Sequence, residues 1–240
     1  MSNGVNPAAL AASLRRLDQR GDPGALRPSL RRVIEACDQL FDVDGSGLML
    51  TDDDGDLHYT AASDGPGTLL EQAQIETGQG PCIDTFTHDL AVDTTDVTSD
   101  ARWPDLGRRL EGLGVAAVLA VPVHLAGVCV GSLNLYRARP GHWDHAQLVA
   151  LEKFAEVAET MMSAAVAADH AGELASQLSY ALDYRAPIER GVGYLMGRDG
   201  LSQPDAFNLL RSTARNRRRK VADVAEHLLG TGRLPGEERA

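Results

Sequence analysis

The sequence predicts an α+β fold: an antiparallel sheet flanked by helices, followed by a long helical linker and a C-terminal bundle of three helices. Short apolar runs typical of strands lie between residues 47 and 136, and helical periodicity continues from residue 144 to about 182. Three further helical periods fill residues 184–230. A chain of 240 residues with 43% hydrophobic and 24% charged residues is ordinary for a soluble globular protein of one or two domains.

The N-terminal segment, residues 1–27, is rich in small residues, proline and glycine, so we expect a flexible arm there. Three leucines at helical spacing nevertheless permit a short amphipathic helix (Leu10, Leu14 and Leu17). Pro28 suits the first turn of a helix, and apolar residues recur with a helical period from there to Phe41.

Two strand-like runs follow, at residues 47–51 and 57–62, joined by an acidic segment that contains an Asp-Gly pair. Asp-Gly between such runs is typical of a hairpin turn. A calcium loop is a weaker interpretation, because the twelfth position counted from Asp52 is Ser63 and not the glutamate that an EF-hand needs.

The strongest strands are the apolar runs 115–123 and 128–136, which we expect to form a buried antiparallel pair at the sheet centre. With the earlier hairpin and a short strand at 90–93, the sheet has about five strands. The elements expected between these strands are a helix over 66–76, a breaker-rich loop at 78–82 before a short helix, and a helix over 103–113.

A long helical segment begins after Asp144, the expected N-cap, and forms a linker over residues 145–183. A sheet domain alone is not expected to bury an apolar seam of this length, so the sequence predicts a parallel partner helix and a homodimer. Pro187 predicts a kink near residues 183–187. The seam consists of Leu148, Leu151, Phe154, Ala158, Met161, Ala165 and Ala168.

The C-terminal bundle, expected over residues 184–232 before a tail at 233–240, contains the most basic run of the chain. Ser202 and Asp205 suit a helix start, and six basic residues without an acidic one lie between Arg211 and Lys220. Such a run is either a solvated helix end or a surface for a polyanion.

Charge and cysteine content constrain the partners and the compartment. Residues 173–240 hold 11 basic and 9 acidic side chains, whereas residues 1–172 hold 12 and 25, so any affinity for phosphate belongs to the C-terminal part. Three widely spaced cysteines favour a reducing cytoplasm. No signal peptide or membrane-spanning run is visible, so we expect a cytoplasmic protein without a membrane partner.

Residues 184–232 resemble the ANTAR domain, a three-helix RNA-binding module of bacterial transcription antiterminators. The resemblance implies that the protein binds RNA hairpins in nascent transcripts and controls transcription termination. The matching positions are Arg185, Ile188, Glu189, Gly193, Ala206, Phe207, Leu210, Arg211, Lys220 and the Asp-Val-Ala run at 223–225. The RNA-binding positions that it implies are Arg185, Arg190, Gly193, Arg211, Arg215, Arg219 and Lys220.

Two departures from this pattern favour an alternative. The family carries Gln-Ala-Lys where this chain has Arg190-Gly191-Val192, and Pro187 lies inside the first helix. In the alternative, the protein is a dimeric sensor whose degenerate ANTAR bundle is a protein-interaction module.

Residues 28–160 resemble a GAF domain of the actinobacterial kind found upstream of ANTAR modules. The resemblance implies a sensor with a pocket for a small-molecule ligand, and Cys82 is a candidate for the wall of that pocket. It identifies no cofactor. The motifs that carry it are Gly-Gln-Gly-Pro-Cys at 78–82, Arg-Trp-Pro at 102–104, Val-Pro-Val at 121–123 and Gly-Ser-Leu-Asn-Leu-Tyr at 131–136.

Catalysis and metal binding are not expected from the sequence. The loop before Cys82 is similar to that of GAF-fold reductases of free methionine sulfoxide, which use a second cysteine about ten residues on, where this chain has Val92. Only Cys129 remains as a partner, so the reductase is a minor alternative. His142 and His145 lack a third ligand nearby, and we expect no metal site.

Overall fold

A computed structural model describes residues 5–18, 26–51, 57–63, 65–167 and 187–237. The chain forms two compact units, one built around a sheet and one formed by the C-terminal helices, and each is described by itself. Among the described helices, none is long and apolar enough to cross a membrane.

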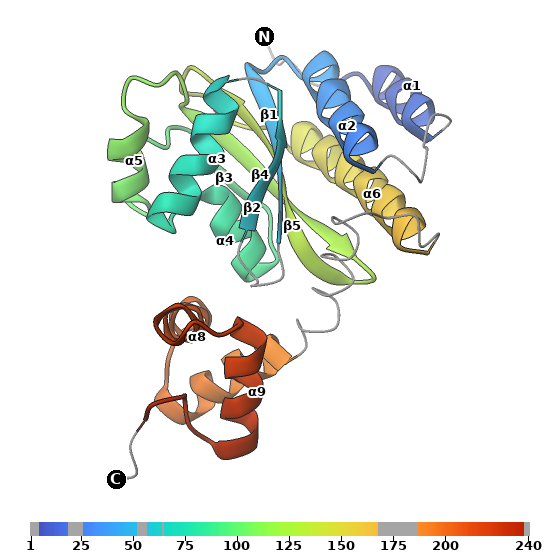
Figure 1. The fold of residues 1–240 in the computed structure, drawn as a ribbon. Helices are drawn as coiled ribbons and strands as arrows, with labels where there is room; N and C mark the ends of the chain where they lie inside the picture. Colours follow the sequence, from blue (N-terminus) through green and yellow to red (C-terminus); the bar gives the residue numbers. More distant parts are fainter. Residues whose placement is uncertain (1–4, 19–25, 52–56, 64, 168–186, 238–240) are drawn as a thin grey trace. The chain divides into compact units, whose positions relative to one another are not determined.

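The sheet of the first unit has five strands within the described residues, in the order β2-β1-β5-β4-β3 (Figure 1). β5 pairs antiparallel with both β1 and β4, and β4 pairs antiparallel with β3. The predicted antiparallel sheet with the two apolar strands near its centre is confirmed. The strands are β1 (Gly45–Thr51), β2 (Leu57–Ala62), β3 (Val92–Thr94), β4 (Ala117–Leu125) and β5 (Val128–Arg137).

Helices cover both faces of the sheet (Figure 1). One face carries α1 (Pro7–Asp18), α2 (Leu26–Leu40) and α6 (His145–Ala167), and the other carries α3 (Gly65–Thr77), α4 (Pro81–His88) and α5 (Pro104–Leu110). Residues on β5 alternate between these layers, so Tyr136 packs with Leu70 and Trp103 on the α3 side. The result is the predicted α+β fold with helical layers around an antiparallel sheet.

The predicted flexible arm is corrected over residues 7–18, which form helix α1 and pack against α2 and α6. The Asn6 side chain caps this helix, because its Oδ1 accepts a hydrogen bond from the Ala8 N–H at 2.9 Å. Leu17 is buried in the contact. The leucine spacing therefore outweighs the proline and glycine content of this segment.

The seam of α6 is also corrected, because most of its described part is buried within the same chain, while Leu148 and Met161 are half-buried. Leu151, Phe154 and Ala158 are fully buried where α6 lies against β4 and α2, and the Phe154 ring lies 6.0 Å from that of Phe41. A partner helix is therefore not needed to cover these residues. The remainder of the predicted linker, with most of the predicted kink, lies outside the described residues.

The start of α6 is held by a reciprocal cap. Asp144 Oδ1 accepts a hydrogen bond from the Gln147 N–H at 2.8 Å, and Gln147 Oε1 accepts one from the Asp144 N–H at 3.1 Å. The two side chains together satisfy two backbone donors that the helix itself leaves open. The predicted N-cap at Asp144 is confirmed.

We expect Asp144→Ala to lower the free energy of unfolding by about 1 kcal/mol, because it removes this cap. Urea denaturation measures the change. Asp144→Asn, which keeps an oxygen acceptor, serves as the control and is expected to stay close to the native protein. Equal midpoints for the alanine and asparagine variants would contradict the capping role.

The described part of the C-terminal unit consists of helical residues 187–199 followed by α8 (Gln203–Arg217) and α9 (Val221–Thr231). The first helix lies close to the other two, since a Cβ added at Gly191 would lie 3.0 Å from the Ala225 Cβ and 3.4 Å from Leu210. Ser202 Oγ accepts a hydrogen bond from the Asp205 N–H at 3.3 Å, which confirms the predicted helix start. The core residues are Ile188, Leu195, Ala206, Leu210, Val224 and Leu228.

Candidate functional site

A group of buried polar side chains lies between the sheet and helices α3 and α4, and we call it the buried polar cluster. Glu71 and Gln74 are one turn apart on α3, and Ser132 and Asn134 are two residues apart on β5, so each pair lies on one face of its element. Cys82 is the second residue of α4 and not part of a loop as the sequence predicts. All five are buried.

Hydrogen bonds and two glycines fix the cluster. Asn134 Nδ2 donates to Glu71 Oε1 at 2.7 Å, and the Cys82 N–H donates to Gln74 Oε1 at 2.8 Å. A Cβ at Gly47 would overlap Glu71 Oε1, and one at Gly80 would overlap Gln74 Oε1. The absence of a side chain on both glycines therefore makes room for the polar groups.

Burial sets the charge of the cluster. It raises the pKa of Glu71 from its ordinary value of 4.5 to about 8, and the hydrogen bond from Asn134 opposes this rise. The carboxyl is therefore mainly protonated at pH 7. It therefore has a proton to donate at a buried position.

Three buried atoms of the cluster have no hydrogen-bond partner among the described residues: Glu71 Oε2, Gln74 Nε2 and Ser132 Oγ. Buried polar atoms are normally satisfied, by protein, water or ligand. The three atoms supply one amide donor and two oxygens. This combination suits a small polar molecule with both donors and acceptors.

Cys82 has the wrong environment for a nucleophile. Burial raises the pKa of its thiol well above the ordinary value, and the negative charge that Glu71 gains once it is deprotonated raises this pKa further. The group is therefore a thiol at neutral pH. All three cysteines are buried, and none of them forms a disulfide within the described residues. The role of Cys82 in ligand binding stays a prediction, and its place in the cluster is compatible with it.

The predicted RNA-binding residues come from three parts of the C-terminal unit. Arg190 and Gly193 are exposed on the helix 187–199, Arg211 is half-buried on α8, and Arg219 is exposed in the loop before α9, where Lys220 is the N-cap. Arg185 and the side chain of Arg215 lie outside the described residues.

The loop between α8 and α9 turns sharply in its basic run. Arg218 has a φ of 52°, and the Arg219 N–H donates to the Ala214 carbonyl at 3.0 Å. Arg217 and Arg218 are both exposed. These two residues are not among the RNA-binding positions that the ANTAR resemblance implies, although they belong to the basic run 211–220. Cations at the C-terminal end of a helix are also favoured by its dipole, so a purely solvated run is physically reasonable.

Val192 stands where the ANTAR pattern has a lysine, and the structure places it in the bundle with only 8% of its surface exposed. This position therefore contributes to packing in the present chain. A basic surface on this unit has to be formed by the exposed arginines.

The sequence interpretation missed the polar residues of the cluster other than Cys82. A signal was present, because Glu71 and Gln74 share a helical spacing with the apolar Leu70 and Ala73. Ser132 and Asn134 likewise alternate within an apolar strand. Polar residues on a face that is otherwise apolar indicate a buried polar site.

Comparison with protein families gives two matches. The GAF domain matches residues 26–162, which include the whole buried polar cluster, and the ANTAR domain matches residues 176–229, which include the basic run. No curated protein matches the chain.

Several solved structures share the fold of the first unit. The free methionine-R-sulfoxide reductase of Neisseria meningitidis, solved in complex with its substrate, is 17% identical over 67% of this chain and 89% of its own, with a TM-score of 0.53. The reduced fRMsr of Staphylococcus aureus is 13% identical over 67% and 99%, with a TM-score of 0.52. The GAF domain of an Acinetobacter phosphoenolpyruvate-protein phosphotransferase is 17% identical over 70% and 99%, with a TM-score of 0.51. Identities this low show the fold alone.

Proposed function

The chain belongs to the GAF domain family and carries an ANTAR domain C-terminal to its GAF domain, and on this premise we propose that it is a signal-responsive transcription regulator that binds RNA. In this proposal the GAF domain is the sensor. The ANTAR domain binds hairpins in nascent transcripts and so controls transcription termination.

The observation that carries the proposal is the basic run of the ANTAR domain. Six basic residues and no acidic one lie between Arg211 and Lys220, and Arg217, Arg218 and Arg219 are exposed. RNA-binding proteins hold the phosphate backbone with such side chains, and arginine also stacks on bases. The acidic remainder of the chain limits nonspecific binding by repulsion.

The buried polar cluster is our candidate for the sensing pocket. Its unsatisfied donors and acceptors favour a small polar ligand over an apolar one. We propose no catalysis, because the raised pKa of Cys82 keeps its sulfur protonated. Cytoplasmic location and homodimerisation also belong to the proposal, and dimerisation now depends on the linker beyond the described part of α6.

A protein-interaction module is the second candidate function of the C-terminal unit. Tyr194 and Met196 are large apolar side chains that are 39% and 40% exposed, and Val192 has replaced the family lysine. Exposed aromatic and methionine side chains are enriched in protein interfaces. In this candidate the unit docks on another regulator and not on RNA.

The double variant Arg215→Ala with Arg219→Ala tests RNA binding. We expect weaker binding to a hairpin RNA, and a plot of log affinity against log salt that is flatter by roughly 0.7 to 0.9 for each lost phosphate contact. Filter binding over a salt series measures both quantities. The target hairpin comes from sequencing RNA that copurifies with the protein.

The matched control is Arg108→Ala with Arg109→Ala, which removes the same charge from exposed positions of the GAF domain. It is expected to keep the native salt slope. An unchanged affinity and slope in the Arg215/Arg219 variant would remove the basic run from the mechanism. If the native protein also binds hairpin and unstructured RNA of equal length equally, the protein-interaction candidate replaces the proposal.

A further inference from the structure

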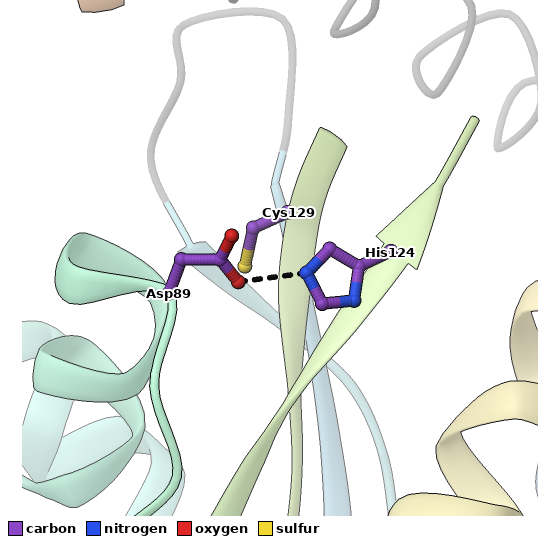
Figure 2. A group of neighbouring side chains, drawn as sticks. All are labelled: Asp89, His124 and Cys129. Atoms are coloured by element: carbon purple, nitrogen blue, oxygen red, sulfur yellow. Dashed lines mark hydrogen bonds and ion pairs between the residues drawn. The ribbon is translucent and has the colours of Figure 1, made fainter. Parts of the chain in front are cut away.

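Three side chains with metal-binding chemistry meet at one end of the sheet, and we call them the Asp-His-Cys triad (Figure 2). Asp89 follows α4, His124 lies near the end of β4, and Cys129 is the second residue of β5. One potential ligand atom from each lies within 4.8 Å of the other two. His124 Nε2 is 2.7 Å from Asp89 Oδ1.

The hairpin between β4 and β5 brings His124 and Cys129 together. Ala126 and Gly127 have φ values of 51° and 79°, which form the two-residue turn that suits a tight hairpin. His124 is paired with Cys129 in the register, and directly opposed residues of antiparallel strands project from the same face. The two side chains are therefore presented together by the backbone.

The end of α4 supplies Asp89 to the same place. Asp89 is the C-cap in the left-handed conformation, with φ 55° and ψ 43°, which aspartate tolerates better than most residues. The C-terminal end of a helix carries partial negative charge and so favours a nearby cation. Figure 2 shows the carboxylate, the imidazole and the sulfur turned toward one another.

We propose that the triad binds a divalent transition metal ion, with Zn²⁺ as its first candidate, through Asp89 Oδ1, His124 Nε2 and Cys129 Sγ. Oxygen, imidazole nitrogen and thiolate sulfur together are a donor set that zinc accepts, whereas calcium and magnesium take oxygen ligands. One carboxylate and one thiolate neutralise the two charges of the ion. The imidazole binds through Nε2 and keeps its proton on Nδ1.

The geometry is close to that of a bound state. Zinc–ligand bonds of about 2.0 to 2.3 Å in a tetrahedron place the ligand atoms roughly 3.3 to 3.8 Å apart. Binding therefore replaces the short His124–Asp89 contact by two bonds to the ion. The Cys129 thiol, which donates to the Gly131 carbonyl at 3.5 Å, gives its proton to solvent and its sulfur to the metal.

Exposure leaves a route for the ion and for a fourth ligand. The side chains of His124 and Asp89 are 32% and 50% exposed, while Cys129 is buried behind them. Three protein ligands with one position open to solvent are typical of zinc sites that also accept water or an external ligand. A bound metal ion would connect the C-terminal end of α4 to the β4–β5 hairpin. The other end of α4 carries Cys82 and so lies at the buried polar cluster.

Zinc titration of the metal-free, full-length protein tests this site. We expect calorimetry to give one ion per chain, with proton release that varies with the ionisation enthalpy of the buffer. Co²⁺ in place of Zn²⁺ is expected to give a thiolate-to-metal charge-transfer absorption that Cys129→Ser abolishes. Asp89→Asn and His124→Gln are each expected to weaken binding by at least roughly 10- to 100-fold.

Asp89→Asn is the principal variant, because asparagine also tolerates the left-handed conformation and the fold is kept. His145→Gln is the matched control, since it removes an exposed histidine of the competing His142/His145 pair and is expected to leave binding unchanged. Native-like affinity in Asp89→Asn, loss of binding in His145→Gln, or a native protein that takes up no zinc would each overturn the proposal. The last result would reduce the triad to a hydrogen-bonded His124–Asp89 pair beside a buried thiol.

Discussion

Replacement of Glu71 by glutamine is expected to remove a large pH dependence from the stability of the GAF domain. The folded state holds the pKa of Glu71 at about 8, against an ordinary value of 4.5, because the carboxyl is buried. Between these values the folded protein binds a proton that the unfolded chain has lost. The native protein therefore loses up to about 1.4 kcal/mol of unfolding free energy for each unit that the pH rises in this window, relative to Glu71→Gln.

Glutamine mimics the protonated acid, because it keeps an oxygen to accept the hydrogen bond from Asn134. Urea denaturation at pH 5, 6, 7 and 8 measures the effect. The unfolding free energy of Glu71→Gln, minus that of the native protein, should increase as the pH rises. Glu76→Gln is the control on the same helix, where the side chain is exposed and pairs with Arg109. Parallel pH profiles for the native protein and Glu71→Gln would show that Glu71 is ionised or hydrated in the folded state.

Local signals in the sequence were sufficient for most of the fold. The pair β4–β5 depends on a short turn and on contiguous apolar runs, and it was predicted. The strands β1 and β2 are neighbours in the sheet, as was also predicted. The cap at Asp144 is a signal of the same kind. Helix α1 was underestimated because its stability comes from contact with α6, more than 120 residues later in the chain, and its composition favours a loop.

The candidate sites also divide into those that contiguous residues form and those that residues far apart in the chain form. Six basic residues within the ten positions 211–220 are visible without a structure, so the basic run was found. Glu71 was not found because a glutamate on a helix is normally solvated, so its spacing with the apolar residues of the helix was a weak signal. The structure shows that it is buried and accepts a hydrogen bond from Asn134, 63 residues away. The metal-ligand candidates Asp89 and His124 are 35 residues apart and meet only through the order of the strands.

The position of Phe154 separates two interpretations of α6. Heptad spacing alone predicts that this residue lies in a dimer interface. The structure instead buries it fully inside the GAF domain, with its ring against Phe41 and the helix against β4. A substitution at this position therefore has different consequences for stability and for molecular mass in the two cases.

Phe154→Ala is expected to lower the unfolding free energy by about 3 to 5 kcal/mol, because it leaves a cavity in a closely packed core. The mass in light scattering should stay that of the native protein, and the urea midpoint should not depend on protein concentration more than the native midpoint does. Phe154→Leu keeps most of the buried apolar surface and should lose less stability. An unchanged unfolding free energy together with a lower mass in light scattering would contradict this expectation and place Phe154 in a subunit interface. In an interface, loss of the ring weakens association of the subunits but leaves no cavity in the core of the domain.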